Sequence, residues 1–424
     1  MAKYIVENSG PLEGTLTISG SKNAVLPLMA ASVLTDEKCV ICDTPALRDV
    51  DVMCALIGSI GGSVQFHEQT NQVELETRNI LLEGAPSELA QKMRASVLIM
   101  GPLLARTGKA KIALPGGCAI GARPIDLHLK GFQALGAEVI MKQDANFDYV
   151  EARAQKLVGS DIYLDFPSVG ATENLMMVAC MAQGVSTIQN AAEEPEIVDL
   201  ANFLNKMGAR VKGAGTDTIR IEGVPKLKGT KHVVIPDRIE TGTFMAAAAI
   251  TRGRIKLENA VADHVRPVIL KLRECGVAVE EDDDFIVVDA RGSQLKATNI
   301  KTLPYPGFPT DMQAQFMALL TVARGCSVVT ETVFENRFMH AGELQKMNAD
   351  IRIDGNTARI NGVSHLQAAT VAATDLRAGA AMVIAAQMAR GTSVITEIQH
   401  IERGYENFCQ KLEKIGTRIK VLDI

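Results

Sequence analysis

The stretch Phe203-Leu204-Asn205-Lys206-Met207-Gly208-Ala209-Arg210-Val211 holds the pattern that decides the fold. Leu200, Phe203, Leu204 and Met207 recur at the helical spacing, which predicts one buried face of an amphipathic helix. Glycine is the residue that most easily adopts the left-handed conformation found just after a helix. The stretch therefore predicts a helix that ends at Gly208 and passes directly into a strand.

The same pattern occurs six times along the 424 residues. The place of Gly208 is taken by glycine in five copies and asparagine in one, at positions 61, 136, 208, 276, 348 and 416, which are 68 to 75 residues apart. Each unit is interpreted as strands mixed with two helices, an α+β arrangement. Three units per domain is the simplest division, with a boundary near Lys228 to His232, where Gly and Lys cluster.

A second helix recurs in each unit and is rich in Ala and Met. Examples are Thr241 to Ile250, Met312 to Val322 and Leu376 to Met388. These segments are apolar nearly all round, which predicts buried helices. Their first turns nevertheless carry polar or charged residues, and a helix N-terminus offers free backbone N–H groups and a partial positive charge. The pattern therefore favours phosphate or carboxylate ligands at these helix starts.

Composition excludes several classes of function. The hydrophobic content of 47% with 22% charged residues is typical of a globular protein. The formal charge of −5 and an aromatic content of 4% without Trp argue against a nucleic-acid partner. We find no signal peptide and no apolar run long enough to span a membrane, so we expect a soluble, cytoplasmic protein.

The eight cysteines are scattered over the chain and indicate no disulfide scaffold. Cys39 and Cys42 form a C-x-x-C, but it lies in a stretch typical of a strand, with no second pair and no supporting His spacing. A buried structural role is favoured over a metal or redox role. No His pair, carboxylate cluster or cysteine quartet indicates a catalytic metal.

Several short motifs, in order along the whole chain, resemble the enolpyruvyl transferase family. They are Ser19-Gly20-Ser21-Lys22-Asn23-Ala24, Leu114-Pro115-Gly116-Gly117-Cys118-Ala119-Ile120-Gly121, Ala122-Arg123-Pro124-Ile125-Asp126-Leu127-His128, Phe308-Pro309-Thr310-Asp311-Met312-Gln313, Phe334-Glu335-Asn336-Arg337-Phe338-Met339-His340, Thr374-Asp375-Leu376-Arg377 and Glu402-Arg403-Gly404-Tyr405-Glu406. Each motif alone is weak, but all of them in order are specific. The resemblance implies two inside-out α/β barrel-like domains, each of three βαβαββ units around buried central helices.

The resemblance also implies how the chain is divided. One domain is expected to span residues 22–231 and carry the Cys118 loop. The other is expected to comprise residues 1–21 and 232–424 and carry Asp311, with the active site in the cleft between the two. That the first residues join the second half is implied by the family and not by the repeats.

The activity that the resemblance implies is transfer of the enolpyruvyl group of phosphoenolpyruvate to the 3′-hydroxyl of UDP-N-acetylglucosamine, the first committed step of peptidoglycan synthesis. Phosphoenolpyruvate carries a phosphate and a carboxylate, which arginine binds well in bidentate geometry and lysine binds as a point charge. The family's residues for this ligand correspond here to Lys22, Asn23, Arg123, Arg337, Arg377 and Arg403. Taken singly, each cation is more often a surface charge.

The catalytic residues implied by the resemblance are Cys118, Asp311 and Arg403. Cys118 lies in a glycine-rich loop five residues before Arg123, and a nearby cation favours a thiolate. In the family this thiol protonates the methylene carbon of phosphoenolpyruvate and can carry a covalent adduct. Asp311 is implied as the base, or the orienting acceptor, for the sugar hydroxyl. A lone cysteine is more often a buried apolar group, and an aspartate at a helix start needs no further role.

The residues that the resemblance assigns to UDP-N-acetylglucosamine are spread over both halves of the chain. They are Arg94, Arg123, Pro124, Ile125, Asp126, His128, Ser168, Val169, Gly170, Asp311 and Val333. His128 taken alone is more often structural. Some family members carry a Lys two residues before the Ser-Val-Gly turn where this chain has Phe166, which puts a direct cation contact with the diphosphate there in doubt.

The chemistry implied is addition followed by elimination of phosphate, with no cofactor and no ATP. No G-x-x-x-x-G-K-[ST] is present, and no G-x-G-x-x-G follows a strand. The expected partners are the two small-molecule substrates, without nucleic acid or membrane, and the chain is expected to be a monomer or a weak oligomer. Two alternatives stay open: enolpyruvyl transfer to shikimate 3-phosphate, and a non-catalytic regulator that binds the sugar nucleotide.

Overall fold

The computed structural model describes residues 2–84, 86–114, 125–143 and 148–422. The described chain divides into two compact units. Unit 1 holds the residues up to Ser19 and those from Pro236 onward, and unit 2 lies between Gly20 and Ile235. Each unit has its own hydrophobic core, and the two cores share no residue.

Six β-sheets are formed by the described residues, three in each unit. The sheets of unit 2 have the orders β13-β3-β5-β4, β6-β8-β7 and β11-β12-β10-β9. Their strands are β3 (Cys39–Cys42), β4 (Ser63–His67), β5 (Gln72–Glu76), β6 (Lys109–Ala113), β7 (Glu138–Gln143), β8 (Asp148–Arg153), β9 (Asp161–Tyr163), β10 (Val185–Gln189), β11 (Arg210–Lys212), β12 (Thr218–Glu222) and β13 (Lys231–Val233).

The sheets of unit 1 follow the same plan, with the orders β15-β16-β14-β2, β17-β18-β20-β19 and β21-β22-β1-β23. Their strands are β1 (Lys3–Glu7), β2 (Glu13–Thr17), β14 (Arg254–Glu258), β15 (Ala278–Glu281), β16 (Phe285–Asp289), β17 (Ile300–Lys301), β18 (Cys326–Thr330), β19 (Asp350–Asp354), β20 (Thr357–Asn361), β21 (Thr370–Ala372), β22 (Thr392–Thr396) and β23 (Ile419–Leu422). Each four-stranded sheet joins one parallel pair to two antiparallel pairs. Six copies of one supersecondary unit therefore build the fold.

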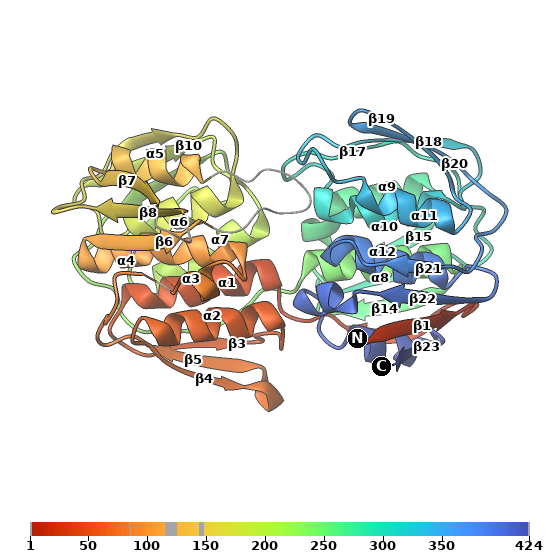
Figure 1. Cartoon of the computed structure of the whole chain (residues 1–424), viewed down its shortest axis with the longest axis horizontal. Coiled ribbons are helices and arrows are strands. Elements are labelled where there is room, and N and C mark those ends of the chain that lie inside the picture. The colour runs from red at the N-terminus through yellow and green to blue at the C-terminus, as the bar shows by residue number, and fades with distance from the viewer. Residues whose placement is uncertain (1, 85, 115–124, 144–147, 423–424) are drawn as a thin grey trace. The chain divides into compact units, whose positions relative to one another are not determined.

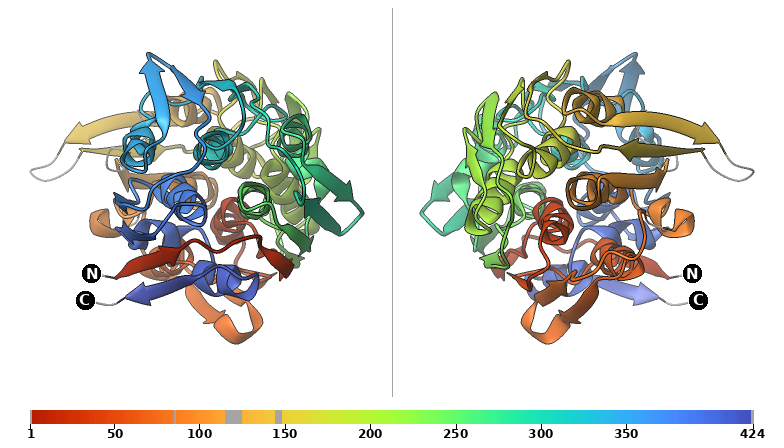
Figure 2. Two further views of the ribbon diagram at one scale, coloured as in Figure 1. Left: turned by 90° about the vertical axis from the view of Figure 1, so that its right-hand side faces the viewer. Right: turned by 90° about the vertical axis from the view of Figure 1, so that its left-hand side faces the viewer.

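The first strand of the chain belongs to the last repeat. β1 lies between β22 and β23 and pairs antiparallel with both, with Tyr4 opposite Ile395 and Val421. Figure 2 shows β1 and β23 side by side. The middle strand of the C-terminal sheet is therefore supplied by the N-terminus.

Buried helices form the centre of each unit, with the sheets outside them (Figure 1). In unit 1 these are α8 (Arg238–Ile250), α10 (Gln313–Leu320) and α12 (Leu376–Ala386), which pack against one another. In unit 2 they are α1 (Lys22–Ala31), α4 (Met100–Thr107) and α6 (Val169–Ala179). Within α8 every residue after Arg238 is buried, in agreement with its run of small side chains. The inside-out arrangement expected from the sequence is confirmed.

A second set of helices covers the sheets and ends at the repeated residues. They are α2 (Arg48–Ser59), α5 (Asp126–Ala134), α7 (Pro195–Lys206), α9 (Arg266–Glu274), α11 (Met339–Lys346) and α13 (Phe408–Lys414), with a short α3 (Ser87–Ala90) besides. All six repeated residues after these helices have positive φ, from 68° at Asn348 to 106° at Gly61. The predicted left-handed helix ends are therefore confirmed in every copy.

The C-x-x-C pair lies in β3, as the sequence predicts. Both cysteines are free, and Cys39 is fully buried. Burial raises the pKa of the Cys39 thiol to about 11, which makes it a poor thiolate. Among the helices that the structure describes, none has the length and apolar character needed to cross a membrane.

Candidate active site

Asp311 in unit 1 is held by two buried arginines. It lies in the short 3₁₀ helix η5 (Thr310–Met312) that leads into α10. Arg337 Nη2 donates to its Oδ1 at 2.9 Å, and Arg377 Nε donates to its Oδ2 at 3.1 Å, with Arg377 Nη2 also 3.1 Å from Oδ2 in an ion pair. The Asp311 side chain is 28% exposed, against 4% and 3% for the two arginines. The carboxylate therefore faces solvent while its partners are fixed behind it.

Each of the two arginines retains an unused donor. Arg337 Nη1 and Arg377 Nη1 are buried and have no hydrogen-bond partner among the residues that the structure covers. The guanidinium groups lie over aromatic rings, that of Arg337 at 5.4 Å from the centre of Phe334 and that of Arg377 at 5.3 Å from Tyr405. Buried donors without a partner are costly, which indicates that an anionic ligand completes the arrangement.

The charge of Arg377 is secured by its surroundings. Burial alone would lower the pKa of Arg377, but Tyr405, Asp311 and Asp237 together raise it above its ordinary value. The Tyr405 hydroxyl lies 2.9 Å from Thr243 Oγ1 and accepts from Gln315 Nε2 at 3.3 Å. Gln315 also donates to the backbone oxygen of Asp311 at 2.9 Å. One buried network therefore fixes both the aspartate and the arginine.

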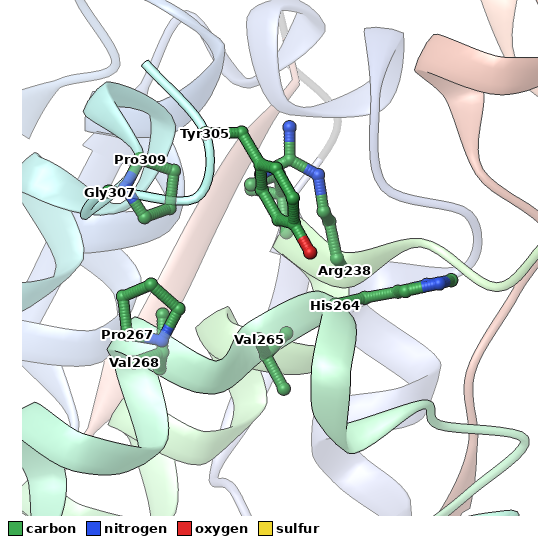
Figure 3. A pocket seen from close by; sticks show the side chains of 9 residues that line it. Arg238, His264, Val265, Pro267, Val268, Tyr305, Gly307 and Pro309 are labelled. Carbon is green, nitrogen blue, oxygen red and sulfur yellow. The ribbon is translucent and has the colours of Figure 1, made fainter. Parts of the chain in front are cut away.

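A small pocket in unit 1 lies where α8 begins, and Pro309, which directly precedes η5, lines it (Figure 3). Arg238 and Tyr305 lie next to each other on its wall, with the guanidinium 5.8 Å from the ring centre, and Pro309 lines the opposite part. It encloses no space large enough for a water molecule. Pockets for drug-sized ligands usually enclose roughly 300–1,000 Å³. The pocket is therefore too small to hold a nucleotide sugar by itself.

In unit 2, Lys22 begins the buried helix α1. The side chain of Ser21 caps this helix by accepting from the backbone N–H of Ala24 at 3.3 Å. Lys22 Nζ lies 2.8 Å from Asp49 Oδ2, with the two side chains 13% and 4% exposed. Asn23 follows and is half-buried. The ammonium group is thus fixed at a helix start, where backbone N–H groups also favour an anion.

His128 and Gly170 meet in unit 2 at the start of α6. A Cβ atom on Gly170 would lie 3.5 Å from the imidazole, so the ring covers the backbone there. The side-chain amide of Asn174 donates to His128 Nδ1 at 3.1 Å. Burial, with a contribution from the positive charge of Arg94, lowers the pKa of His128 to about 3. The imidazole is therefore neutral at physiological pH, and its Nε2 carries the proton.

The remaining assigned residues lie on elements of both units. Ser168 caps α6 by accepting from Ala171 N at 3.4 Å, and Val169 and Gly170 form its first turn. Ile125 is buried and precedes α5, whose first residue Asp126 is exposed. In unit 2, Arg94 begins the 3₁₀ helix η3 (Arg94–Ile99). In unit 1, Val333 lies in the loop after β18, and Arg403 ends the 3₁₀ helix η6 (Ile398–Arg403).

Three of the assigned residues, Cys118, Arg123 and Pro124, lie outside the described residues. Phe166 is exposed, and its backbone oxygen accepts from Ser168 N at 2.7 Å. Within the described ranges, no group of three or more His, Cys, Asp or Glu residues could hold a metal ion.

Sequence reasoning missed the buried carboxylates Asp49 and Glu331, whereas the half-buried Asp375 belongs to a motif quoted from the sequence. Glu173 lies in α6, and burial together with the nearby Glu196 and Glu194 raises its pKa well above the ordinary value. Asp49 pairs with Lys22, and Glu331 is buried after β18. Asp375 caps α12 by accepting from Arg377 N at 2.8 Å. Only Asp375 had a signal in the sequence, since aspartate before a helix is typical of an N-cap.

Comparisons with known proteins agree with one another. A family model described as EPSP synthase (3-phosphoshikimate 1-carboxyvinyltransferase) matches residues 6–412. UDP-N-acetylglucosamine 1-carboxyvinyltransferase 1 of Caldanaerobacter subterraneus subsp. tengcongensis is 58% identical over 417 residues, which cover 98% of this chain and 99% of that protein. UDP-N-acetylglucosamine 1-carboxyvinyltransferase of Finegoldia magna is 55% identical over 99% of this chain and 98% of its own length.

Solved structures share the fold at low sequence identity. The enolpyruvyl transferase NikO from Streptomyces tendae superposes with a TM-score of 0.89 at 21% identity, covering 99% of this chain and 98% of that one. EPSP synthase from Acinetobacter baumannii superposes with a TM-score of 0.78 at 18% identity over the whole of both chains. At these identities the likeness concerns the architecture alone, and it confirms the expected fold.

Proposed function

Because the chain belongs to the EPSP synthase family, and within it to the UDP-N-acetylglucosamine 1-carboxyvinyltransferases, we propose that it transfers the enolpyruvyl group of phosphoenolpyruvate to the 3′-hydroxyl of UDP-N-acetylglucosamine. The observation that carries this proposal is the 58% identity to an enzyme of that name over 98% of the chain. The arrangement of Asp311 with Arg337 and Arg377 supports it on chemical grounds.

Phosphoenolpyruvate brings two anionic groups on a three-carbon frame. The free Nη1 donors of Arg337 and Arg377 suit a phosphate or carboxylate, since guanidinium groups bind such oxygens in charge-assisted hydrogen bonds. Lys22, Asn23, Arg123 and Arg403 are proposed to complete the set of donors. Fixed positive charge of this kind stabilises the negative charge that gathers as phosphate leaves.

Asp311 is proposed as the group that takes the proton from the sugar hydroxyl. Its carboxylate is partly exposed and oriented by two guanidinium groups, as a base that must meet a substrate requires. Arrival of an anionic ligand at the Nη1 groups would weaken the stabilisation of the Asp311 carboxylate, because the ligand's negative charge offsets the positive charge of the two guanidinium groups. The carboxylate would then become more basic as the site fills.

Unit 2 supplies the proposed contacts with the nucleotide. The backbone N–H groups in the first turn of α6, at Val169 and Gly170, suit the diphosphate because a helix N-terminus attracts anions, and Ser168 caps this turn beside them. His128 beside them is neutral and offers an N–H donor without adding charge. Arg94, Pro124, Ile125 and Asp126 are proposed to hold the rest of the nucleotide, and Val333 to approach the sugar.

The proposed reaction is an addition followed by an elimination. Cys118 gives a proton to the methylene carbon of phosphoenolpyruvate, and the sugar 3′-oxygen, having lost its proton to Asp311, forms a bond to the neighbouring carbon. The tetrahedral intermediate then loses a proton from the methyl group and expels phosphate, which restores the double bond as an enol ether. Atoms and charge balance with no oxidant and no nucleotide triphosphate.

Phosphate release tests this proposal directly. Purified protein should release phosphate only when phosphoenolpyruvate and UDP-N-acetylglucosamine are both present, and mass spectrometry should show one enolpyruvyl group added to the sugar nucleotide. Turnover with shikimate 3-phosphate and none with the sugar nucleotide would favour the first alternative. Binding of the sugar nucleotide without phosphate release would favour the non-catalytic one.

We further propose a cytoplasmic enzyme that is monomeric or weakly oligomeric.

A further inference from the structure

Glu331 is a buried carboxylate directly after β18, only 3% exposed. Its Oε1 accepts from Thr302 Oγ1 at 2.7 Å, and from the backbone N–H groups of Val333 at 2.8 Å and Phe334 at 3.3 Å. Its Oε2 accepts from Thr310 Oγ1 at 2.9 Å and Gln313 Nε2 at 3.3 Å. Five donors therefore converge on one side chain.

None of these five donors carries a charge. Burial of a carboxylate without a cation is unfavourable unless its oxygens are well supplied with hydrogen bonds. An apolar residue would fill this space at lower cost if packing were the only requirement. The arrangement is instead suited to fixing the donors in place, because a carboxylate accepts from several directions at once.

The donors belong to the segments that carry the proposed substrate contacts. Thr310 and Gln313 flank Asp311 on either side. Val333 is itself a proposed sugar contact, and the ring of Phe334 lies under Arg337. Gln313 Nε2 also donates to the backbone oxygen of Arg337 at 3.3 Å. This hydrogen bond links the segment around Asp311 to the segment from Val333 to Arg337.

We propose that Glu331 is a positioning residue for sugar-nucleotide turnover, which fixes Asp311, Val333 and Arg337 relative to one another. This inference rests on the proposed function and extends it to a residue that touches no substrate. Small displacements of a reacting group lower rates strongly, by about 10²-fold for 1 Å. Loosening this carboxylate should therefore alter catalysis far more than folding.

Glu331→Gln tests the inference with little change in shape. If the oxygen of the new amide still accepts from Val333 N and Phe334 N, its NH₂ group must face the NH₂ group of Gln313. Two donors cannot hydrogen-bond to each other, so the contact with Gln313 is lost. We expect KM for UDP-N-acetylglucosamine to rise about tenfold and kcat/KM to fall about 10–100-fold, with KM for phosphoenolpyruvate changing less. Glu281→Gln is the matched control, since that carboxylate lies in the same unit and pairs only with cations of α9.

Thr302→Val provides a second, milder variant. It removes one donor to Glu331 and the acceptor of the Thr332 backbone N–H at 2.9 Å, but it replaces neither the carboxylate nor any residue proposed to contact substrate. We expect the same direction of change, about two- to threefold in KM for the sugar nucleotide, by the same loss of orientation. Circular dichroism and melting temperature of each variant identify any protein that has failed to fold.

The outcomes separate this inference from the proposed function. Wild-type protein that neither binds the sugar nucleotide nor releases phosphate would overturn the proposed function and this inference with it. If wild type turns over and folded Glu331→Gln and Thr302→Val match it in both KM values, the inference alone is wrong. A fall in kcat that only matches the fraction of protein that has failed to fold, with both KM values unchanged, would indicate a purely structural role and would also overturn it.

Discussion

At the scale of single residues, Asp311 is the group whose replacement has the clearest expected effect. Asp311→Asn keeps the shape of the side chain but cannot accept the proton of the sugar hydroxyl. We expect kcat to fall by about 10²–10⁴-fold, while calorimetry still detects binding of UDP-N-acetylglucosamine. Asp354→Asn, on the exposed surface of β19, is the control. A kcat near that of wild type would remove Asp311 from the mechanism.

Glu240 in α8 should make the stability of the protein depend on pH. Burial raises the pKa of Glu240 from 4.5 to about 7, although Lys411 opposes the shift and Asp237 adds to it. Between these values the folded state holds a proton that the unfolded chain releases. The stabilising contribution is therefore complete below about pH 4.5 and is lost as the pH rises through about 7, by about 3 kcal/mol in all.

Urea unfolding at pH 5 and pH 7.5 measures this effect. Glu240→Gln cannot titrate, so the difference in the free energy of unfolding between the two pH values should shift by that amount relative to wild type. At pH 5 Glu240 is protonated in the folded wild type, so only at the higher pH does the variant lack an ion pair with Lys411, and the raised pKa already includes that pair. Identical slopes in the two proteins would show that Glu240 keeps its ordinary pKa.

The sequence allowed the types of site residues to be predicted but not all their contacts. Arg337 and Arg377 could be assigned to an anion from the sequence. Their hydrogen bonds to Asp311 could not be predicted, because Arg337 is 26 residues and Arg377 is 66 residues away from it in the chain. Helix and strand periodicity relates residues only a few positions apart, so it gives no information about contacts across such separations in sequence. Glu331 lies at the end of a strand and leaves no local pattern, because its five donors come from separate segments. Tertiary packing alone brings these groups together.

At the scale of elements, the glycine that closes α7 offers a clean test of the repeat. Gly208 has a φ of 100°, and a Cβ there would meet nothing within 4 Å. Gly208→Ala should therefore cost about 1–2 kcal/mol in the free energy of unfolding through backbone strain alone. Gly208→Asn should cost less, because Asn348 occupies the equivalent position at a φ of 68°.

Gly342 within α11 is the matched control for this prediction. It also has open space around the position of its Cβ, but its φ is not positive. Alanine is the better helix former, so Gly342→Ala should stabilise the protein by up to about 1 kcal/mol. Denaturant unfolding compares the two. Equal changes at Gly208 and Gly342 would contradict the assignment of Gly208 to a strained helix end.

Helix ends were more predictable than helix starts. The six left-handed residues follow from a local rule, since only glycine and asparagine tolerate that conformation easily. The helix expected from Met312 to Val322 instead begins at Gln313, after the 3₁₀ turn of η5, and ends at Leu320. Hydrogen bonds from Thr310 and Gln313 to Glu331 hold this start, and they depend on a residue beyond the helix.

At the scale of the whole molecule, the N-terminal strand is expected to control the stability of the C-terminal repeat. β1 is the strand to which both β22 and β23 are bonded. A variant that begins at Ser9 lacks it and leaves β23 without its partner. We expect unit 1 to melt at a lower temperature while unit 2 is unaffected, which gives two calorimetric transitions. A single transition at the wild-type temperature would contradict this expectation.

The position of β13 has a consequence for synthesis on the ribosome. β13 pairs with β3, so once Val233 has emerged every described strand of unit 2 is available, and that half can fold during translation. β1 must wait for strands that begin at Thr392. At about 5–20 residues per second, this delay is roughly 20–80 s. β1 is thus the first strand to be synthesised and among the last to pair. Its backbone N–H and C=O groups stay unpaired with β22 and β23 until the end of elongation.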